Sequence, residues 1–176
     1  MNTSTSKVSL CGSSTQLYGV LPSVGSNAPD FILVNSKLKN HSLKNYQGKK
    51  KLLYIVPSLD TSVCASSSKK FSELAADKPD DSIIIIVSSD LPFAQTRFCT
   101  DLNTADITSL STMRSENFAK DYGVLILEGP LAGLTTRAVL VLDEKNKVLY
   151  SELVAEISNE PDYQRAFAAL TEDQRS

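Results

Sequence analysis

The sequence has few of the residues on which hydrolytic and metal-dependent active sites depend. Among its 176 residues there are one histidine and three cysteines. A Ser-His-Asp or Cys-His mechanism would rest on His41, expected at the surface of a polar loop, and no Gly-x-Ser-x-Gly elbow is present. Three cysteines without close spacing, with one distant histidine, make a poor set of zinc ligands. Because the sequence also has neither a glycine-rich phosphate-binding loop nor a Cys-x-x-Cys pair, the remaining candidate chemistry is that of a reactive thiol.

Long apolar runs and a large excess of one charge are missing as well. No uniformly apolar run is longer than the one at Ile83–Val87, whereas a membrane-spanning helix needs about 20 such residues. The N-terminal segment MNTSTSKVSLCG has no apolar stretch of the kind found in secretory signal peptides. The net charge of −2, without a basic stripe, argues against nucleic acid as a partner. The small, odd number of cysteines favours a reducing compartment, so we predict a cytoplasmic protein without membrane or nucleic-acid partners.

Length and periodicity predict one α/β domain. A chain of this length favours a single domain, residues 1–176, with residues 1–18 as an N-terminal extension that forms a hairpin. Two continuous apolar runs, residues 52–56 and 83–87, indicate strands that are buried on both faces, the second of them over residues 82–88. Strands that alternate with helices describe a layered α/β sheet. Further strands are expected near residues 8–10, 15–17, 30–34, 107–110, 137–143 and 147–153, and helices over residues 62–76, 89–99, 115–122 and 160–171.

The stretch PSLDTSVC, residues 57–64, lies between a predicted strand and a predicted helix. Cys64 would stand in the first helical turn, where unpaired backbone N–H groups and the positive end of the helix dipole favour the thiolate. Thr61 or Ser62 fits the N-cap, and the hydroxyl of Thr61 can face the same pocket as the thiol. Pro57 ends the strand and shields the turn. The alternative role for Cys64 is packing in the core, because free cysteines are among the most buried residues.

Two further features come later in the chain. The stretch DLPFAQTRFC ends at Cys99 and is expected to form a short helix with Pro92 in its first turn. Ser89 or Asp90 is the expected cap of that helix. Two thiols on neighbouring helices could form a reversible disulfide, and the alternative is that Cys99 packs the end of its helix. Arg137 leads the apolar strand AVLVLD and needs an acceptor there, for which a thiolate would serve and a carboxylate is the alternative.

Five segments of the chain together point to a family. PSLDTSVC contains the pattern Pro-x-x-x-Thr-x-x-Cys, and it is followed in order by DLPFAQTRFC, KDYGV, GPLAGLTTRAVLVLD and NEPDYQRAFAAL. The pattern is the signature of peroxiredoxins, and the other four segments are similar to those of the bacterial thiol peroxidases. The resemblance extends from about Leu17 to Leu170, and the shared order of the five segments makes it highly specific.

This resemblance implies a thioredoxin-like fold, in which helices flank a central mixed sheet and a β-hairpin lies at the N-terminus. It implies that Cys64 is the peroxidatic cysteine and that Pro57 shields its pocket. Thr61 and Arg137 would orient and polarise the peroxide. Cys99 matches the resolving cysteine, which implies an intramolecular Cys64–Cys99 disulfide of the atypical two-cysteine type. The resemblance further implies a hydroperoxide substrate, thioredoxin as the reductant, a homodimer, and no metal or organic cofactor.

Two residues stand apart from this pattern. Cys11 matches no catalytic position and is expected to be a packed or idle thiol. Lys69 occupies a position where relatives often have arginine, and a lysine cannot supply a bidentate contact there.

The sequence leaves two functions open. A thiol-dependent peroxidase would reduce hydrogen peroxide and organic hydroperoxides through Cys64 and Cys99. A non-enzymatic redox sensor would use the same disulfide as a switch, and it would keep both cysteines. Consumption of many equivalents of peroxide per chain, in the presence of a reductant, separates the enzyme from the sensor.

Overall fold

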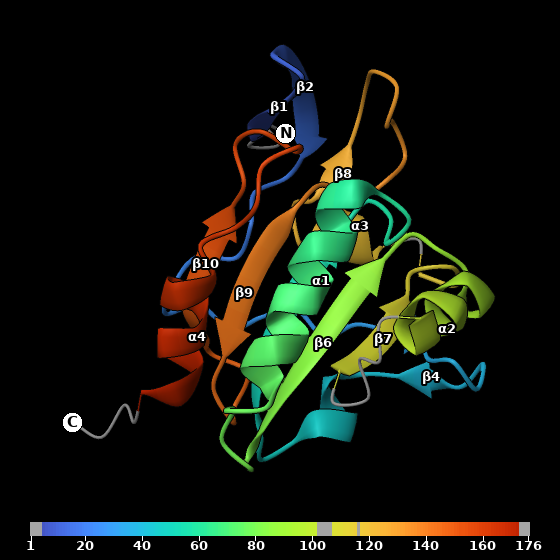
Figure 1. Ribbon diagram of the computed structural model, residues 1–176. Coiled ribbons are helices and arrows are strands. Elements are labelled where there is room, and N and C mark those ends of the chain that lie inside the picture. Colours follow the sequence, from blue (N-terminus) through green and yellow to red (C-terminus); the bar gives the residue numbers. More distant parts are fainter. Residues whose placement is uncertain (1–4, 102–106, 116, 173–176) are drawn as a thin grey trace.

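A mixed β-sheet of seven strands forms the centre of the protein (Figure 1). The computed structural model describes residues 5–101, 107–115 and 117–172, and for residues 64, 65 and 101 it describes the backbone alone. From one edge to the other, the strands are β10 (Val148–Leu153), β9 (Ala138–Leu142), β5 (Lys50–Val56), β6 (Ser82–Ser88), β7 (Ile107–Ser111), β3 (Leu33–Val34) and β4 (Asn40–His41). β6 is parallel to both β5 and β7, whereas β9 is antiparallel to β5. The predicted α/β sheet is therefore confirmed.

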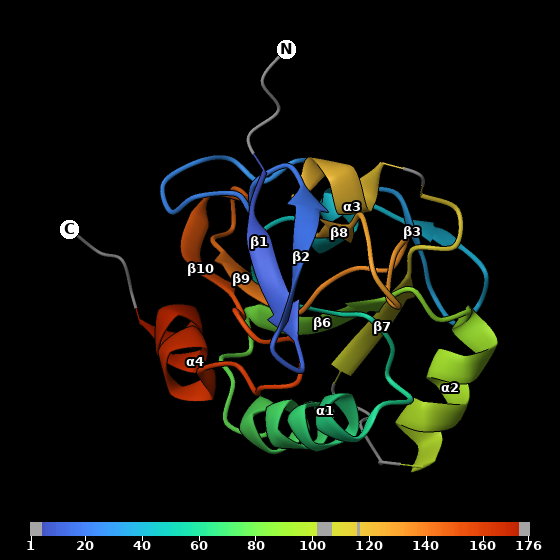
Figure 2. The same cartoon turned by 90° about the horizontal axis from the view of Figure 1, so that it is seen from above.

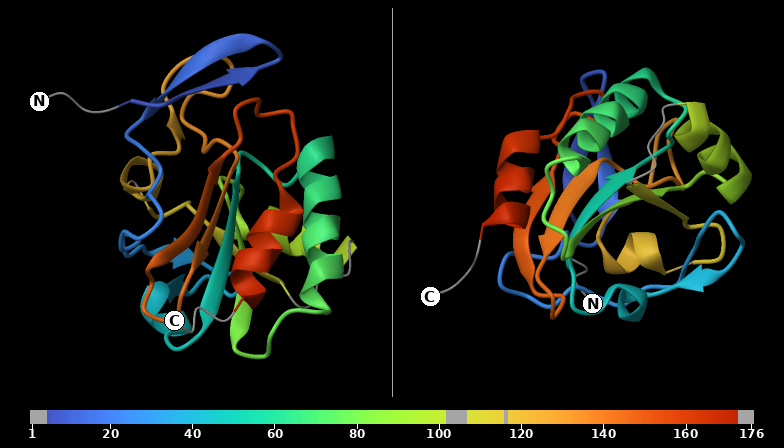
Figure 3. Two further views of the ribbon diagram at one scale, coloured as in Figure 1. Left: turned by 90° about the vertical axis from the view of Figure 1, so that its left-hand side faces the viewer. Right: turned by 60° about the horizontal axis from the view of Figure 1, so that its bottom comes forward.

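The two central strands, β5 and β6, are buried on both faces, as their continuous apolar runs predict. Successive β5 side chains join two different core clusters: Leu52 and Tyr54 belong to one, Leu53 and Ile55 to the other. One face of the sheet is covered by α1 (Ser62–Ala75), α2 (Pro92–Asp101) and α4 (Tyr163–Thr171) (Figure 2). The short helices η1 (Leu43–Tyr46) and α3 (Phe118–Asp121) lie on the other face (Figure 3, right). The helices thus form two layers around the sheet.

The predicted N-terminal hairpin is present. β1 (Lys7–Leu10) pairs antiparallel with β2 (Ser13–Tyr18), and β2 pairs in turn with β8 (Leu125–Ile126). The turn of the hairpin is held by the carboxylate of Glu156, which accepts hydrogen bonds from the N–H groups of Cys11 and Gly12 at 2.9 and 3.1 Å. The same carboxylate accepts the Ser9 hydroxyl at 2.8 Å. The hairpin is therefore fastened to the chain that follows β10.

The helix predicted over residues 115–122 is shorter than expected. α3 covers Phe118–Asp121 alone, and its first residue donates its N–H to the Ser115 hydroxyl at 3.1 Å. Gly123 ends the helix with a φ of 65°, in the region that side chains disfavour. A Cβ at this position would lie 2.2 Å from the backbone carbon of Val20, so glycine is required by close approach as well as by backbone conformation.

His41 lies in the edge strand β4 and is half-buried, rather than at the surface of a loop as expected. Its Nδ1 lies 2.8 Å from the hydroxyl of Tyr46, and its Nε2 lies 2.8 Å from the side-chain amide of Asn35. These partners occupy both ring nitrogens in a structural role.

In the parts of the chain that the structure describes, no helix has the length and apolar character needed to cross a membrane.

Candidate active site

The stretch that contains Cys64 begins at the carboxyl end of β5. This strand ends at Val56, Pro57 follows in a buried position, and α1 begins at Ser62. Cys64 is the third residue of α1, so its backbone lies in the first helical turn, as predicted. The Cys64 side chain lies outside the described part of the structure. The backbone nonetheless gives this residue the helix-start position at which the dipole and the unpaired N–H groups favour an anion.

Thr61 immediately precedes α1 and is exposed. Its hydroxyl donates to the carbonyl of Ser58 at 3.4 Å, which is a long contact. The N–H of Asp60 donates to the Ser58 hydroxyl at 3.1 Å. These bonds close the chain between Pro57 and α1 into a local turn. The turn sets the Thr61 side chain at the start of the helix that contains Cys64.

Arg137 lies at the same end of the sheet. Ile55 is the register partner of Ala138, so Arg137 stands just before β9, next to the point where β5 gives way to Pro57. The side chain is 2% exposed. Its Nε donates to the carbonyl of Ile157 at 2.9 Å, and a terminal nitrogen donates to the hydroxyl of Tyr54. A buried guanidinium requires such acceptors, and these two hold it in a defined orientation.

Tyr54 connects Arg137 with α1. The guanidinium carbon of Arg137 lies 6.0 Å from the centre of the Tyr54 ring, and this ring lies 4.8 Å from that of Phe71 on α1. Phe71 in turn meets the ring of Tyr163 on α4, with 5.1 Å between the centroids. Tyr54 was missed by the sequence reasoning. Its signal was present, because a tyrosine inside a buried apolar strand requires a partner for its hydroxyl.

The hydroxyl of Tyr163 donates to the hydroxyl of Ser67 on α1 at 2.7 Å. Burial raises the pKa of Tyr163 to about 12, against the smaller opposing effect of the bond to Ser67. The phenol is therefore neutral near pH 7. Tyr163 thus joins α4 to α1 as a neutral hydrogen-bonding group.

The three remaining residues of interest lie in different places. Cys99 is the eighth residue of α2 and is half-buried. Cys11 is exposed at the turn of the N-terminal hairpin, with a φ of 50°. Lys69 is exposed on α1. The structure thus puts Cys64 and Cys99 in two helices that cover the same face of the sheet (Figure 2).

Asp90 is a further residue of this region that the sequence reasoning misassigned. It was expected to cap α2, but the carbonyl of Leu91 accepts the first helical N–H groups, from Ala94 and Gln95 at 3.0 and 3.1 Å. The N-cap position therefore belongs to Leu91, and the predicted cap at Ser89 or Asp90 was wrong. The carboxylate of Asp90 instead points to the turn that precedes α1 in the sequence.

Hydrogen bonds and strand pairing connect the chain segments at this end of the sheet. The hydroxyl of Thr135 donates to the carbonyl of Val56 at 2.7 Å. Ser88, at the end of β6, is the register partner of Val56. Residues 56–61, 88–90 and 135–137 thus converge at the carboxyl ends of β5 and β6 from three separate parts of the chain. This convergence is the candidate active site.

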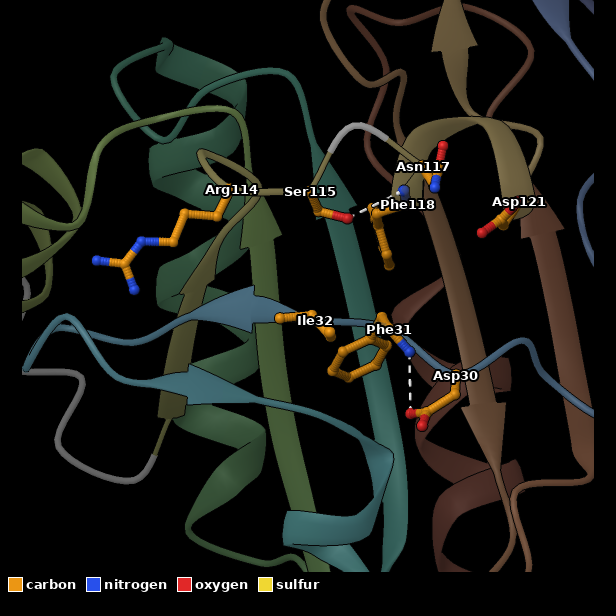
Figure 4. Close-up of a pocket in the computed structure, with 8 residues that line it drawn as sticks. All are labelled: Asp30, Phe31, Ile32, Arg114, Ser115, Asn117, Phe118 and Asp121. Atoms are coloured by element: carbon orange, nitrogen blue, oxygen red, sulfur yellow. Dashed lines mark hydrogen bonds between the residues drawn. The ribbon is translucent and has the colours of Figure 1, made fainter.

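Cavities near and far from this edge differ in size. A small cavity of about 50 Å³ lies between the turn before α1 and α2, and it is lined by Leu59, Asp60, Asp90, Ala94, Arg97 and Phe98. A larger cavity, of about 500 Å³, is shown in Figure 4. It lies between residues 30–32 on one side and residues 114, 115, 117, 118 and 121 on the other, and Arg114 at its rim donates to the carbonyl of Leu38. None of the residues predicted to act in catalysis lines this larger cavity, so it is separate from the candidate site.

Among the residues that the structure describes, no group of three or more histidine, cysteine, aspartate or glutamate side chains is arranged to hold a metal ion.

Comparisons with known proteins point to one family. The model of the Redoxin family matches residues 23–167. A thiol peroxidase of Leptospira interrogans is 48% identical over 165 residues, which cover 93% of this chain and 96% of the relative. A peroxiredoxin-like protein from Aquifex aeolicus is 38% identical with a TM-score of 0.88, over 94% of this chain and 96% of that one. A thiol peroxidase from Chromobacterium violaceum is 28% identical with a TM-score of 0.83, over 90% and 91% of the two chains.

Proposed function

The chain belongs to the Redoxin family and within it to the thiol peroxidases, and from this premise we propose that it reduces hydroperoxides through the thiolate of Cys64. The observation that supports this most directly is the position of Cys64 in the first turn of α1, at the sheet edge where the buried guanidinium of Arg137 is anchored. A cation and a helix N-terminus near one thiol both favour its thiolate form.

In the first step the Cys64 thiolate attacks one oxygen of the O–O bond. An S–O bond forms, the O–O bond breaks, and the thiolate is oxidised to a sulfenic acid. The other oxygen leaves as an alkoxide or hydroxide and takes a proton to give an alcohol or water. Arg137 and Thr61 would donate to the oxygens while negative charge develops on the leaving oxygen, and Pro57 would keep solvent away from the pocket.

In the second step Cys99 resolves the sulfenic acid. The Cys99 sulfur attacks the sulfur of Cys64, an S–S bond forms, the S–O bond breaks, and the oxygen leaves as water. A dithiol reductant then returns both cysteines to thiols by exchange. We propose thioredoxin as this reductant, which is what membership of the thiol peroxidases implies.

We further propose that the protein works as a homodimer in the reducing cytoplasm, without a metal or an organic cofactor. The small number of cysteines supports that compartment, because intracellular thiols there are kept reduced. The substrates would be hydrogen peroxide and organic hydroperoxides.

NADPH consumption in the presence of thioredoxin and thioredoxin reductase tests this function. We expect continuous consumption with hydrogen peroxide and with a bulky organic hydroperoxide, over many equivalents per chain. The Cys64→Ser variant should show none. Consumption that stops after a single equivalent of peroxide per chain, with the Cys64–Cys99 disulfide persisting in the presence of thioredoxin, would favour the redox sensor instead.

A further inference from the structure

The carboxylate of Asp90 joins the turn before α1 to the start of α2. Its Oδ1 accepts the hydroxyl of Ser58 at 2.7 Å, and its Oδ2 accepts the N–H of Leu59 at 2.7 Å. The hydroxyl of Ser88 donates to Oδ2 at 2.8 Å. Hydrogen bonds of this length to a charged acceptor are among the strongest in proteins. The carboxylate of Asp90 therefore holds, through hydrogen bonds, the segment of chain that leads to Cys64.

The backbone that carries Asp90 is itself firmly held. The hydroxyl of Ser111, on the neighbouring strand β7, donates to the Asp90 carbonyl. Gln95, a fully buried residue of α2, donates from its amide to the Ser88 hydroxyl and to the carbonyl of Leu110, both at 2.9 Å. The sheet therefore holds Asp90 in place. If the hydrogen bonds of its carboxylate break, the turn at Ser58 and Leu59 is the part that moves away.

The two cysteines of the proposed reaction lie on the two sides of this bond. The bonded turn leads within a few residues into the first turn of α1, which contains Cys64, and Asp90 stands two positions before α2, which contains Cys99. A disulfide needs the two Cα atoms within about 7 Å of each other. Because both cysteines lie inside helices, we expect the first turn of α1, the segment around Cys99, or both to unwind before they can pair.

We propose that Asp90 is a positioning residue that holds the turn before α1 closed and thereby sets how often the Cys64 sulfenic acid reaches Cys99. This inference rests on the proposed function and adds to it a residue that controls the fate of the intermediate. While the turn is held, the sulfenic acid stays in the folded pocket. When Asp90 releases Ser58 and Leu59, the first turn of α1 can unwind and the disulfide can form.

Two reactions compete for the sulfenic acid. In the first, Cys99 displaces water from it and the disulfide results. In the second, another hydroperoxide transfers an oxygen to the sulfenic sulfur, which gives a sulfinic acid at Cys64 and releases an alcohol or water. The first reaction needs the open turn and the second needs the folded pocket, so Asp90 favours the second at the expense of the first.

Asp90→Asn is the direct test, because it keeps the size of the side chain and turns one acceptor into a donor. The amide would then face the hydroxyl of Ser58 or the N–H of Leu59. Ser58→Ala removes one of the two bonds to the turn and provides a milder second variant. Asp143→Asn is the matched control: its Oδ1 accepts the N–H groups of Lys145 and Lys147, both at 2.8 Å, in the turn after β9.

The first measurement is the peroxide concentration at which half of the Cys64 becomes sulfinic acid in one turnover, read by mass spectrometry. We expect this concentration to rise about tenfold in Asp90→Asn, the ratio that corresponds to loss of one typical net hydrogen bond. Ser58→Ala should shift it in the same direction by less, and Asp143→Asn should match the unsubstituted protein. Equal sensitivity in Asp90→Asn and the unsubstituted protein, with the fold intact by circular dichroism, would overturn the role of Asp90.

The second measurement does not use peroxide. The Cys64–Cys99 disulfide is equilibrated with a dithiothreitol redox buffer, and its midpoint potential is determined. We expect the potential to fall by about 30 mV in Asp90→Asn, which is a tenfold change for a two-electron couple. An unchanged potential contradicts the inference about Asp90 and leaves the peroxidase proposal intact. Failure of the unsubstituted protein to form this disulfide at all would instead contradict the proposed mechanism itself.

Discussion

Arg137 donates from its Nε to the carbonyl of Ile157 at 2.9 Å. This bond ties the buried guanidinium to the chain after β10, where Glu156 also holds the turn of the N-terminal hairpin through Cys11 and Gly12. A second bond, to the hydroxyl of Tyr54, fixes the guanidinium against β5. The orientation of Arg137 therefore depends on parts of the chain that are far apart in sequence and close at the candidate site.

We expect Arg137→Met to lower the rate constant for peroxide reduction by at least about 10²-fold, the scale of losing one donor that stabilises the transition state. Stopped-flow kinetics of the reduced protein with hydrogen peroxide measure this rate. Arg165→Met, an exposed position on α4, is the control and should react at the normal rate. A normal rate in Arg137→Met, in a folded protein, would show that the guanidinium serves packing alone.

Thr61 provides a test of a single hydroxyl. We expect Thr61→Ser to retain most of the peroxidase activity and Thr61→Val to lose most of it, because Ser keeps the hydroxyl and Val keeps the shape. The comparison uses kcat/KM for hydrogen peroxide under identical reductant. If Thr61→Val retains the activity that Thr61→Ser loses, the shape of the Thr61 side chain matters and its hydroxyl has no catalytic role.

Cys99→Ser should separate oxidation from resolution. The Cys64 sulfenic acid in this variant has no resolving thiol, so we expect one fast turnover followed by conversion of Cys64 to sulfinic acid. Mass spectrometry after increasing amounts of peroxide measures this as a gain of two oxygen atoms per chain. Continued turnover with thioredoxin at the normal rate would mean that Cys99 is not the resolving cysteine.

Glu156 predicts a dependence of stability on pH. Its pKa is lowered to about 2 by hydrogen bonds from Ser158, Gly12 and Ser9, of which that from Ser158 has the largest effect. The folded state thus binds the proton more weakly than the unfolded chain, in which the ordinary pKa is about 4.5. The stability that this carboxylate contributes is therefore complete above about pH 4.5, and it is lost as the pH falls to about 2.

We accordingly expect Glu156→Gln to lower the urea midpoint of unfolding at pH 7, and the difference from the unsubstituted protein to shrink as the pH is lowered towards about 2. Glu128→Gln, at an exposed position, is the control and should leave the midpoint unchanged. A difference that persists without change down to the lowest pH would show that the charge of Glu156 is not what holds the hairpin.

The sequence predicted those parts of the fold that depend on local pattern. The runs at residues 52–56 and 82–88 form β5 and β6 because apolar side chains on both faces require burial between two layers. Cys64 lies in the first turn of α1 because Pro57 ends the strand and a polar turn follows. β5 begins earlier than predicted, at Lys50, because the ammonium groups of Lys50 and Lys51 reach the carbonyls of Glu172 and Asp143.

The relationships that the sequence did not reveal are long-range ones. Asp90 satisfies the usual rule for a helix cap, yet its carboxylate bonds Ser58, which is 32 positions away. The hydroxyl of Tyr54 accepts a hydrogen bond from Arg137, which is 83 positions later in the sequence. No local pattern encodes either pair, because each depends on the order of strands in the sheet. That order brings the end of β5 beside the end of β6 and the start of β9.

The central claim is that Cys64 is oxidised by peroxide and then paired with Cys99, and a peptide map tests it most directly. The reduced protein is treated with one equivalent of hydrogen peroxide, remaining thiols are alkylated, and the digested peptides are identified by mass. We expect a Cys64–Cys99 disulfide as the main product, with Cys11, exposed on the hairpin, alkylated in full. A map in which Cys11 is bridged to either cysteine, or in which Cys64 is alkylated and unoxidised, would contradict the account.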